Sequence, residues 1–268
     1  MSEEKTTMEK EKAILPDITN IKTQETFTLP SKGLIYDKEE NIPASITLRR
    51  MTTKEDKMRM RNESEDKIRR DILQACILDE GVNAGKLKLA DANFLFFRLR
   101  ALSLLDDIYK LQLVCPHCGT SFIHEVKLSE LKINYMTKDK LKNMNVQLPM
   151  SQVEIALKLP SLEDMIKVGD TLRDYYQKFP DVDRTEAIYT ASAVIYIKTI
   201  NKQTVMREEV EDWLDNLDIL DNRALRRKLA EIDELFGIDT DMKCLCPSCQ
   251  LEVSHGLPIT AELFNPSL

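Results

Sequence analysis

Cys115-Pro116-His117-Cys118 and Cys246-Pro247-Ser248-Cys249 are two copies of one short motif, C-P-x-C, and 127 residues separate Cys118 from Cys246. Two cysteine pairs at this spacing are typical of a tetrahedral zinc site, in which each pair supplies two thiolates to one side of the ion. The sequence therefore predicts a zinc site within one chain, with the ligands Cys115, Cys118, Cys246 and Cys249. Sharing of the ion between two chains is the alternative.

Joining cysteines that lie so far apart in the chain costs conformational entropy. Closing a loop of 127 residues costs roughly 4 kcal/mol by the logarithmic chain-entropy relation. Structural zinc contributes about 10–16 kcal/mol in small peptides at neutral pH, so metal binding outweighs loop closure. Because four thiolates fill the tetrahedral shell and leave no position for a catalytic water, we expect the site to be structural.

A histidine follows each motif by six residues, His124 after Cys118 and His255 after Cys249. With four cysteines on the metal, we expect both histidines outside its first shell, packed on a hairpin or hydrogen-bonded to a thiolate. A separate site with two cysteines and one histidine at each motif is the alternative. His117 has a serine as its counterpart, so we expect it to be exposed. The two cysteines outside the motifs, Cys76 and Cys244, are not expected to bind metal.

C-P-H-C also occurs in thiol-disulfide oxidoreductases, where the first cysteine begins a helix. Here both motifs run into strand-like segments, residues 119–128 and 251–258, and the second contains Gly256 and Pro258, which are poor helix residues. A redox site also has no need of two copies. Iron suits a four-cysteine site chemically, but nothing else in the sequence indicates electron transfer. Zinc is therefore the preferred prediction.

The motifs lie within what reads as an internal duplication. Its matched features are strand-like residues 46–49 and 155–158, capped helix starts at Thr52–Glu55 and Ser161–Asp164, and Asp91 with Leu95 and Leu99 against Asp221 with Leu225 and Leu229. The spacing of four places each leucine pair on one helical face, and a serine or threonine followed by an acid caps a helix. We predict a mainly α fold with small β elements (α+β), an internally duplicated helical module whose two CPxC hairpins form a zinc-ribbon-like clasp.

The expected domain organisation follows from this reading. A disordered tail is predicted over residues 1–24, a first repeat over 25–145 and a second repeat over 146–268. Helices are expected over roughly 52–80, 91–105, 161–178, 184–199 and 206–236, the last broken near Asn216.

Composition excludes several classes of protein. The 268 residues are 43% hydrophobic, and we find no apolar run that could span a bilayer and no secretory leader. Six cysteines, four of them in the two motifs, indicate a reduced compartment with a metal site. The net charge of −7 argues against general nucleic-acid binding. The most basic stretch, residues 57–70, is interrupted by acids and reads as a solvated helix face.

Enzymatic chemistry has little support in the sequence. All three histidines lie in or just after the two motifs, and neither a phosphate-binding nor a dinucleotide-binding glycine motif is present among only seven glycines. We therefore expect no catalytic residues and no bound organic cofactor. The prediction is a non-enzymatic protein that acts through contacts with other proteins.

Three further phrases carry a family resemblance: LPSKGLIY at residues 29–36, ITLRRMTTKEDK at residues 46–57, and CPHCG at residues 115–119. Together they resemble the baseplate hub and hub-assembly proteins of T-even-like contractile-tailed bacteriophages. The resemblance is best over residues 26 to about 128, and the second motif with residues 258–264 also fits. Many relatives lack one of the cysteine pairs, whereas both are intact here.

The resemblance implies a viral protein, without catalytic residues, that helps to build the tail baseplate hub. Its implied partners are other tail and hub proteins, not nucleic acid or membrane, and its implied location is the host cytoplasm during assembly. Whether it stays in the virion, which hub protein it binds, its copy number and its oligomeric state are left open. The main alternative is a zinc-ribbon accessory protein of transcription or replication that contacts polymerase or DNA; a redox enzyme is the second.

Overall fold

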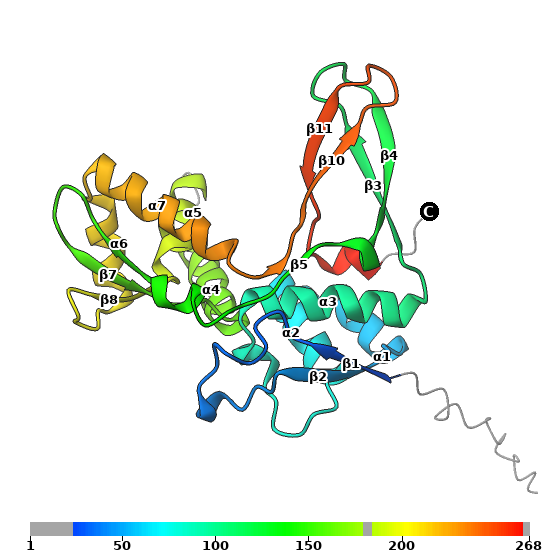
Figure 1. The fold of residues 1–268 in the computed structure, drawn as a ribbon, viewed down its shortest axis with the longest axis horizontal. Helices are drawn as coiled ribbons and strands as arrows, with labels where there is room; N and C mark the ends of the chain where they lie inside the picture. The colour runs from blue at the N-terminus through cyan, green and yellow to red at the C-terminus, as the bar shows by residue number, and fades with distance from the viewer. Residues whose placement is uncertain (1–23, 179–183, 265–268) are drawn as a thin grey trace, which may run out of the picture.

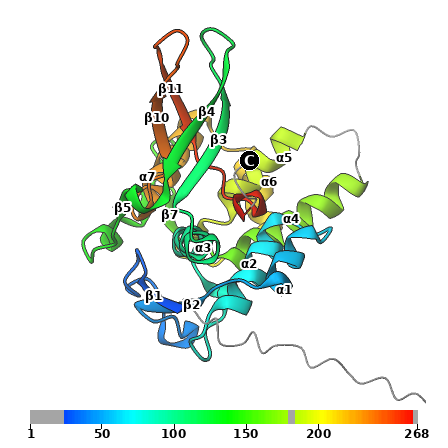
Figure 2. The ribbon, with the colours of Figure 1, turned by 90° about the vertical axis from the view of Figure 1, so that its right-hand side faces the viewer.

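The computed structural model describes residues 24–178 and 184–264, and the predicted disordered tail, apart from Gln24, lies outside them. The described chain forms two lobes and a pair of β-hairpins that project from them (Figures 1 and 2). The hairpin pair consists of residues 108–127 and 241–256, which are distant in sequence and lie side by side in both views.

The first lobe packs a two-stranded sheet on helices. Strands β1 (Gln24–Thr28) and β2 (Ser45–Arg49) are antiparallel, and helices α1 (Thr53–Asp56), α2 (Glu65–Cys76) and α3 (Leu89–Leu104) follow. The predicted capping box is present, because the side chain of Glu55 accepts a hydrogen bond of 2.8 Å from the backbone N–H of Thr52. The single helix predicted over 52–80 is wrong, since a 3-10 turn at Lys57–Met60 and a bend separate α1 from α2.

Asp91, singled out near the start of its helix, is fully buried in the first lobe. Its carboxylate accepts hydrogen bonds from the backbone N–H of Ser31 at 3.0 Å and from the hydroxyl of Tyr36 at 2.7 Å. Burial raises the pKa of Asp91 against the effect of these bonds. The aspartate thus fixes the loop after β1 to α3.

The second lobe has a three-stranded antiparallel sheet, β6 (Asn145–Gln147), β7 (Glu154–Leu157) and β8 (Ile197–Ile200). Helices α4 (Leu162–Lys178), α5 (Arg184–Val194), α6 (Arg207–Asp215) and α7 (Ile219–Asp233) complete it. The expected break near Asn216 is confirmed, while the helix expected over 184–199 ends at Val194 and gives way to β8. Asp221 is fully buried and accepts hydrogen bonds from the backbone N–H groups of Met150 at 2.7 Å and Ser151 at 2.9 Å.

The hairpin pair is built from β3 (Ile108–Val114) with β4 (Ser121–Lys127) and from β10 (Asp241–Leu245) with β11 (Glu252–Gly256). Its bases are joined by β5 (Ile133–Asn134) and β9 (Gly237–Ile238), which pair with each other. After β11, Leu257, Leu263 and Phe264 pack in the core of the first lobe. The chain therefore returns to its first lobe after the second hairpin.

The predictions of a mainly α fold and of a duplicated helical module are wrong. The described residues contain eleven strands in five small sheets beside seven α-helices, and the sheets of the two lobes differ in strand number. Capping boxes recur because every helix must satisfy its first N–H groups, and this does not require a repeated fold. Asp91 and Asp221 each bind a loop of their own lobe, and the sheets of those lobes differ. The division into units 25–145 and 146–268 stays a prediction.

Replacing Asp91 by alanine tests whether this carboxylate holds the first lobe together. Two donors, the Ser31 N–H and the Tyr36 hydroxyl, lose their acceptor. We expect the free energy of unfolding in urea to fall by about 2–4 kcal/mol, since a buried unpaired donor costs about 1–3 kcal/mol. The matched control is Asp139→Ala, whose side chain is 88% exposed, and its effect should stay within about 0.5 kcal/mol. Equal effects of the two variants would contradict this role.

Candidate metal centre

The hairpin pair has an inner and an outer face because side chains alternate along its strands. On β3 and β4, Leu113 and Phe122 are partners in register and half-buried, while the neighbouring Val114 and Ile123 are exposed. Between the hairpins lies a small cluster of its own, formed by Cys115, Cys246, Val253 and the half-buried Phe122, Cys244 and Cys249. The hairpins thus meet over a thin core that is rich in sulfur.

Both motifs form turns with the same backbone hydrogen bonds. In the first, the N–H of Cys115 donates to Thr120 and the N–H of Gly119 donates to Cys115, each at 2.9 Å. In the second, the N–H of Cys246 donates to Leu251 at 3.0 Å and that of Gln250 to Cys246 at 2.9 Å. The residue after the second cysteine is left-handed in both turns, Gly119 at φ 74° and Gln250 at φ 60°. The two turns therefore present their cysteines alike.

The four motif cysteines converge at the tip of the hairpin pair. The Sγ atoms of Cys115 and Cys249 are 3.7 Å apart, as are those of Cys118 and Cys246, and all four lie within 4.8 Å of one another. A disulfide requires about 2.05 Å, whereas four sulfurs bonded to zinc at about 2.3 Å form a tetrahedron with edges of roughly 3.8 Å. The four cysteines are placed to hold a metal ion.

The pKa values of two of these thiols, Cys118 and Cys249, are shifted in opposite directions. The side-chain and backbone hydrogen bonds of Thr120 lower the pKa of Cys118 to about 6. The backbone hydrogen bond of Leu251 by itself lowers the pKa of Cys249, but burial and the three neighbouring sulfurs outweigh it and raise that pKa to about 12. A cation bound between the sulfurs would take the place of the thiol protons and offset the repulsion between the resulting thiolates.

The positions of the histidines do not match the alternative in which each motif forms its own site from two cysteines and one histidine. His117 is exposed, as predicted, and one of its ring nitrogens lies 3.3 Å from the carbonyl oxygen of Glu252 on the other hairpin. His124 of β4 and His255 of β11 instead meet each other, with ring centroids 5.2 Å apart. Burial, with a smaller contribution from His255, lowers the pKa of His124.

Cys244, which the sequence analysis excluded from metal binding, lies beside these two histidines. One ligand atom from each of His124, Cys244 and His255 falls within 4.8 Å of the other two. The sequence contained a signal for the position of Cys244. Cys244 precedes Cys246 by two residues, and a strand places residues at this spacing on one face. Burial, followed by the neighbouring Cys246 and Cys115, raises the pKa of Cys244.

Comparison with known proteins gives one finding on family. A family model described as T4 bacteriophage base plate protein matches residues 22–265, which is most of the chain. No curated protein and no solved structure matches the chain.

Cys118→Ser and Cys246→Ser test the metal centre. Each should remove one zinc ion per chain, measured by elemental analysis of the purified protein, because a three-thiolate shell no longer binds the ion tightly. Each should also lower the free energy of unfolding by about 4 kcal/mol or more, the range in which loss of a metal belongs. The control is Cys76→Ala, a buried cysteine of α2 outside the cluster, which should keep its zinc. A wild-type protein that is stable without metal would refute the assignment.

Proposed function

The chain belongs to the T4 bacteriophage base plate protein family, and on this premise we propose that it is a non-enzymatic structural or assembly protein of the tail baseplate hub. It acts through contacts with other tail proteins, and a structural zinc ion at Cys115, Cys118, Cys246 and Cys249 holds its hairpin pair in shape. The observation that carries the proposal is the approach of four sulfurs from two distant hairpins to within 4.8 Å, at the end of a projection that has an apolar tip.

Zinc is the metal that best suits this cluster. Four thiolates form a closed tetrahedral set, which is the donor arrangement of structural zinc. Isolated two-stranded hairpins are marginally stable in water, and here only a thin core joins the two. An ion at the tip therefore supplies the stability that packing does not.

The tip of the hairpin pair supports the role in protein contacts. Four large apolar side chains close to the cysteine cluster are exposed, namely Val114 at 65%, Ile123 at 62%, Leu245 at 62% and Leu251 at 49%. Single exposed apolar residues are ordinary, but a group at one end of a projection is typical of an interaction site. The metal fixes the turns next to these side chains, so a partner would meet a preorganised surface.

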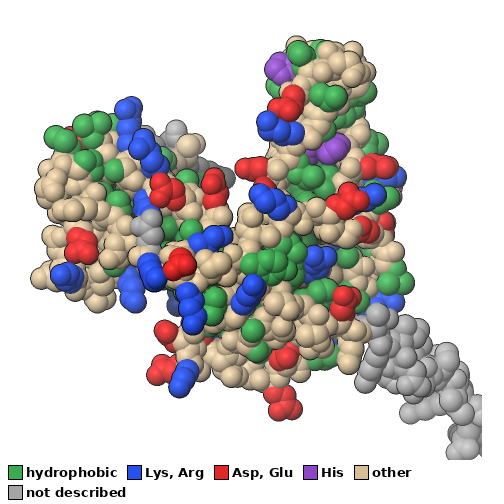
Figure 3. All heavy atoms as spheres, in the orientation of Figure 1, with side chains coloured by type: hydrophobic (Ala, Val, Ile, Leu, Met, Phe, Trp, Pro, Cys, Tyr) green, Lys and Arg blue, Asp and Glu red, His purple; other side chains and the backbone are tan. Residues whose placement is uncertain are grey.

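Charge distribution argues against the zinc-ribbon alternative that contacts DNA. On the face shown in Figure 3, Lys and Arg side chains are interspersed with Asp and Glu. Within the basic stretch 57–70, five side chains form ion pairs with carboxylates: Arg59 with Asp56, Arg61 with Asp71, Lys67 with Asp170, Arg69 with Asp66, and Arg70 with Asp71. These cations are engaged within the protein, whereas phosphate binding requires a concentrated positive face.

The family supports a place of action in the phage baseplate. We propose that the protein acts in the host cytoplasm during assembly, before or as it joins the tail baseplate. In the part of the chain that the structure describes, no helix has the length and apolar character needed to cross a bilayer.

Ile123→Thr and Leu245→Thr test the tip surface. Threonine keeps the β propensity of these strand positions and removes apolar area, so fold and zinc content should be unchanged. In pull-downs from cells that make the whole tail, recovery of identified tail proteins should fall at least tenfold, which corresponds to about 1.4 kcal/mol of binding energy. Met60→Thr, at a largely exposed site on the first lobe, is the control and should not change recovery. Salt-sensitive retention on duplex DNA without captured tail proteins would favour the zinc-ribbon alternative instead.

A further inference from the structure

We propose that His124, Cys244 and His255 form a second zinc site, separate from the four-cysteine cluster and located between the two hairpins. The three residues come from three strands, β4, β10 and β11, and none of them belongs to a C-P-x-C motif. The site does not depend on the proposed role in the baseplate, since it rests only on the geometry of the hairpin pair.

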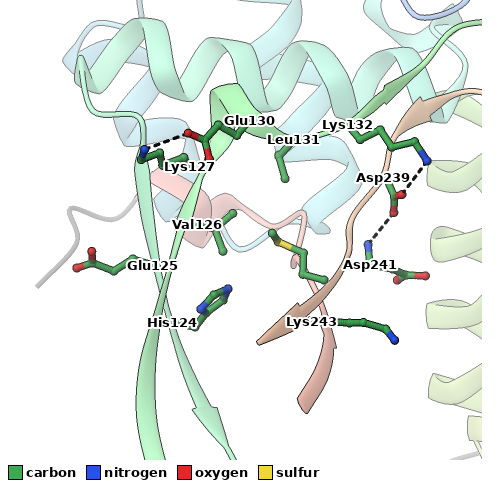
Figure 4. Close-up of a pocket in the computed structure, with 11 residues that line it drawn as sticks. His124, Glu125, Val126, Lys127, Glu130, Leu131, Lys132, Asp239, Asp241 and Lys243 are labelled. Carbon is green, nitrogen blue, oxygen red and sulfur yellow. Dashed lines mark hydrogen bonds and ion pairs between the residues drawn. The ribbon is translucent and has the colours of Figure 1, made fainter. Parts of the chain in front are cut away.

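Strand register explains why these side chains converge. Cys244 is the partner of Val253 in the second hairpin, and Val253 is buried in the cluster between the hairpins. His255 is two residues beyond Val253 and so points to the same side of its strand. His124 approaches from the opposite hairpin, and in Figure 4 its ring points from β4 toward β10 and β11. One ligand atom from each residue lies within 4.8 Å of the other two.

The two ring nitrogens of His255 give an independent indication of a ligand. Both are buried, and within the described residues neither has a hydrogen-bond partner. Buried polar groups are nearly always paired in native proteins, and an unpaired one calls for an explanation such as an ion. The edge-to-face contact with His124, at an interplanar angle of 73°, satisfies neither nitrogen. A metal ion between the rings would take one nitrogen from each.

The donor set and the available space both suit zinc. Two imidazoles and one thiolate are ligands that zinc accepts, with bonds of about 2.0–2.3 Å. Such bonds bring ligand atoms to roughly 3.3–3.6 Å from one another, so the three side chains would have to draw together by at most about 1.5 Å. On binding, the thiol of Cys244 gives up its proton to solvent, and the sulfur and the ring nitrogens donate their electron pairs to the ion.

A cavity adjoins the site at His124, the one proposed ligand that lines it. Its volume is about 440 Å³, and its walls include His124, Val126 and Met242 together with charged side chains near the hairpin bases (Figure 4). Three protein ligands and a water molecule make an open coordination shell, unlike the closed shell of four cysteines. We assign the fourth position to water from this cavity, which makes the second ion more exchangeable than the first.

Zinc stoichiometry of the full-length chain is the direct test. After equilibration with excess Zn²⁺ and removal of free ions, native mass spectrometry should find two ions in the wild type. His124→Ala, His255→Ala and Cys244→Ala should each retain one ion, with the four-cysteine site intact. His117→Ala is the matched control, since this histidine is exposed at the first motif, and it should retain two. A wild type that binds a single ion, or variants that still bind two, would overturn the proposal.

X-ray absorption of the zinc-loaded wild type tests the donor set without any substitution, so misfolding of a variant cannot decide the outcome. Two sites of the proposed composition supply five sulfur and two imidazole nitrogen ligands for every two ions. A spectrum with sulfur ligands alone would mean that only the four-cysteine site is filled, and would refute the second site. Loss of imidazole scattering in His255→Ala, but not in His117→Ala, would assign the signal to this cluster.

Discussion

The approach of four sulfurs at the tip of the hairpin pair is the constraint on which the projecting part of the protein depends. Each hairpin is a two-stranded ribbon, which is marginally stable by itself, and the core they share near the tip centres on Cys115, Cys246 and Val253. The four sulfurs lie within 4.8 Å of one another, and four thiolates at this spacing would repel one another. The zinc ion that we propose at this cluster would offset that repulsion and become the main attraction between the hairpins.

The other end of the hairpin pair is held by hydrogen bonds. Strands β5 and β9 pair beneath the hairpins, and the N–H of Asp239 donates to the carbonyl of Lys132 at 2.9 Å. Arg100 of α3 is fully buried and donates to the carbonyl oxygens of Leu263, Asp106 and Ile108. Because these carbonyls belong to the segment after β11 and to the start of β3, one side chain anchors both hairpins to the first lobe. The proposed zinc ion would therefore have to stabilise only the end of the hairpin pair that is far from the lobes.

Sequence alone predicted the features that depend on short-range spacing. The cysteine quartet follows from C-P-x-C, because the turn that this spacing favours places two sulfurs on one side, and the cap at Thr52 depends on four consecutive residues. The overall architecture was beyond such reasoning, since similar helix starts at Asp91 and Asp221 occur in lobes with different sheets. The histidine and cysteine group was also missed, because His124, Cys244 and His255 meet only when two hairpins pack face to face.

The two clusters suit different tasks, because a closed shell and an open one respond differently to their surroundings. Four thiolates on one ion exclude further ligands, so a metal at the tip cluster would act as a rigid joint near the exposed Ile123 and Leu245. In the second group, His124 lines a cavity with mixed charges, where Lys132 and Asp239 form an ion pair. A partner that inserts a side chain there could complete the shell of the proposed second ion, whereas a partner at the tip would contact the exposed apolar side chains of Ile123 and Leu245. Binding of a partner to the tip, and binding of a partner side chain to the second ion, would then contribute independently to assembly.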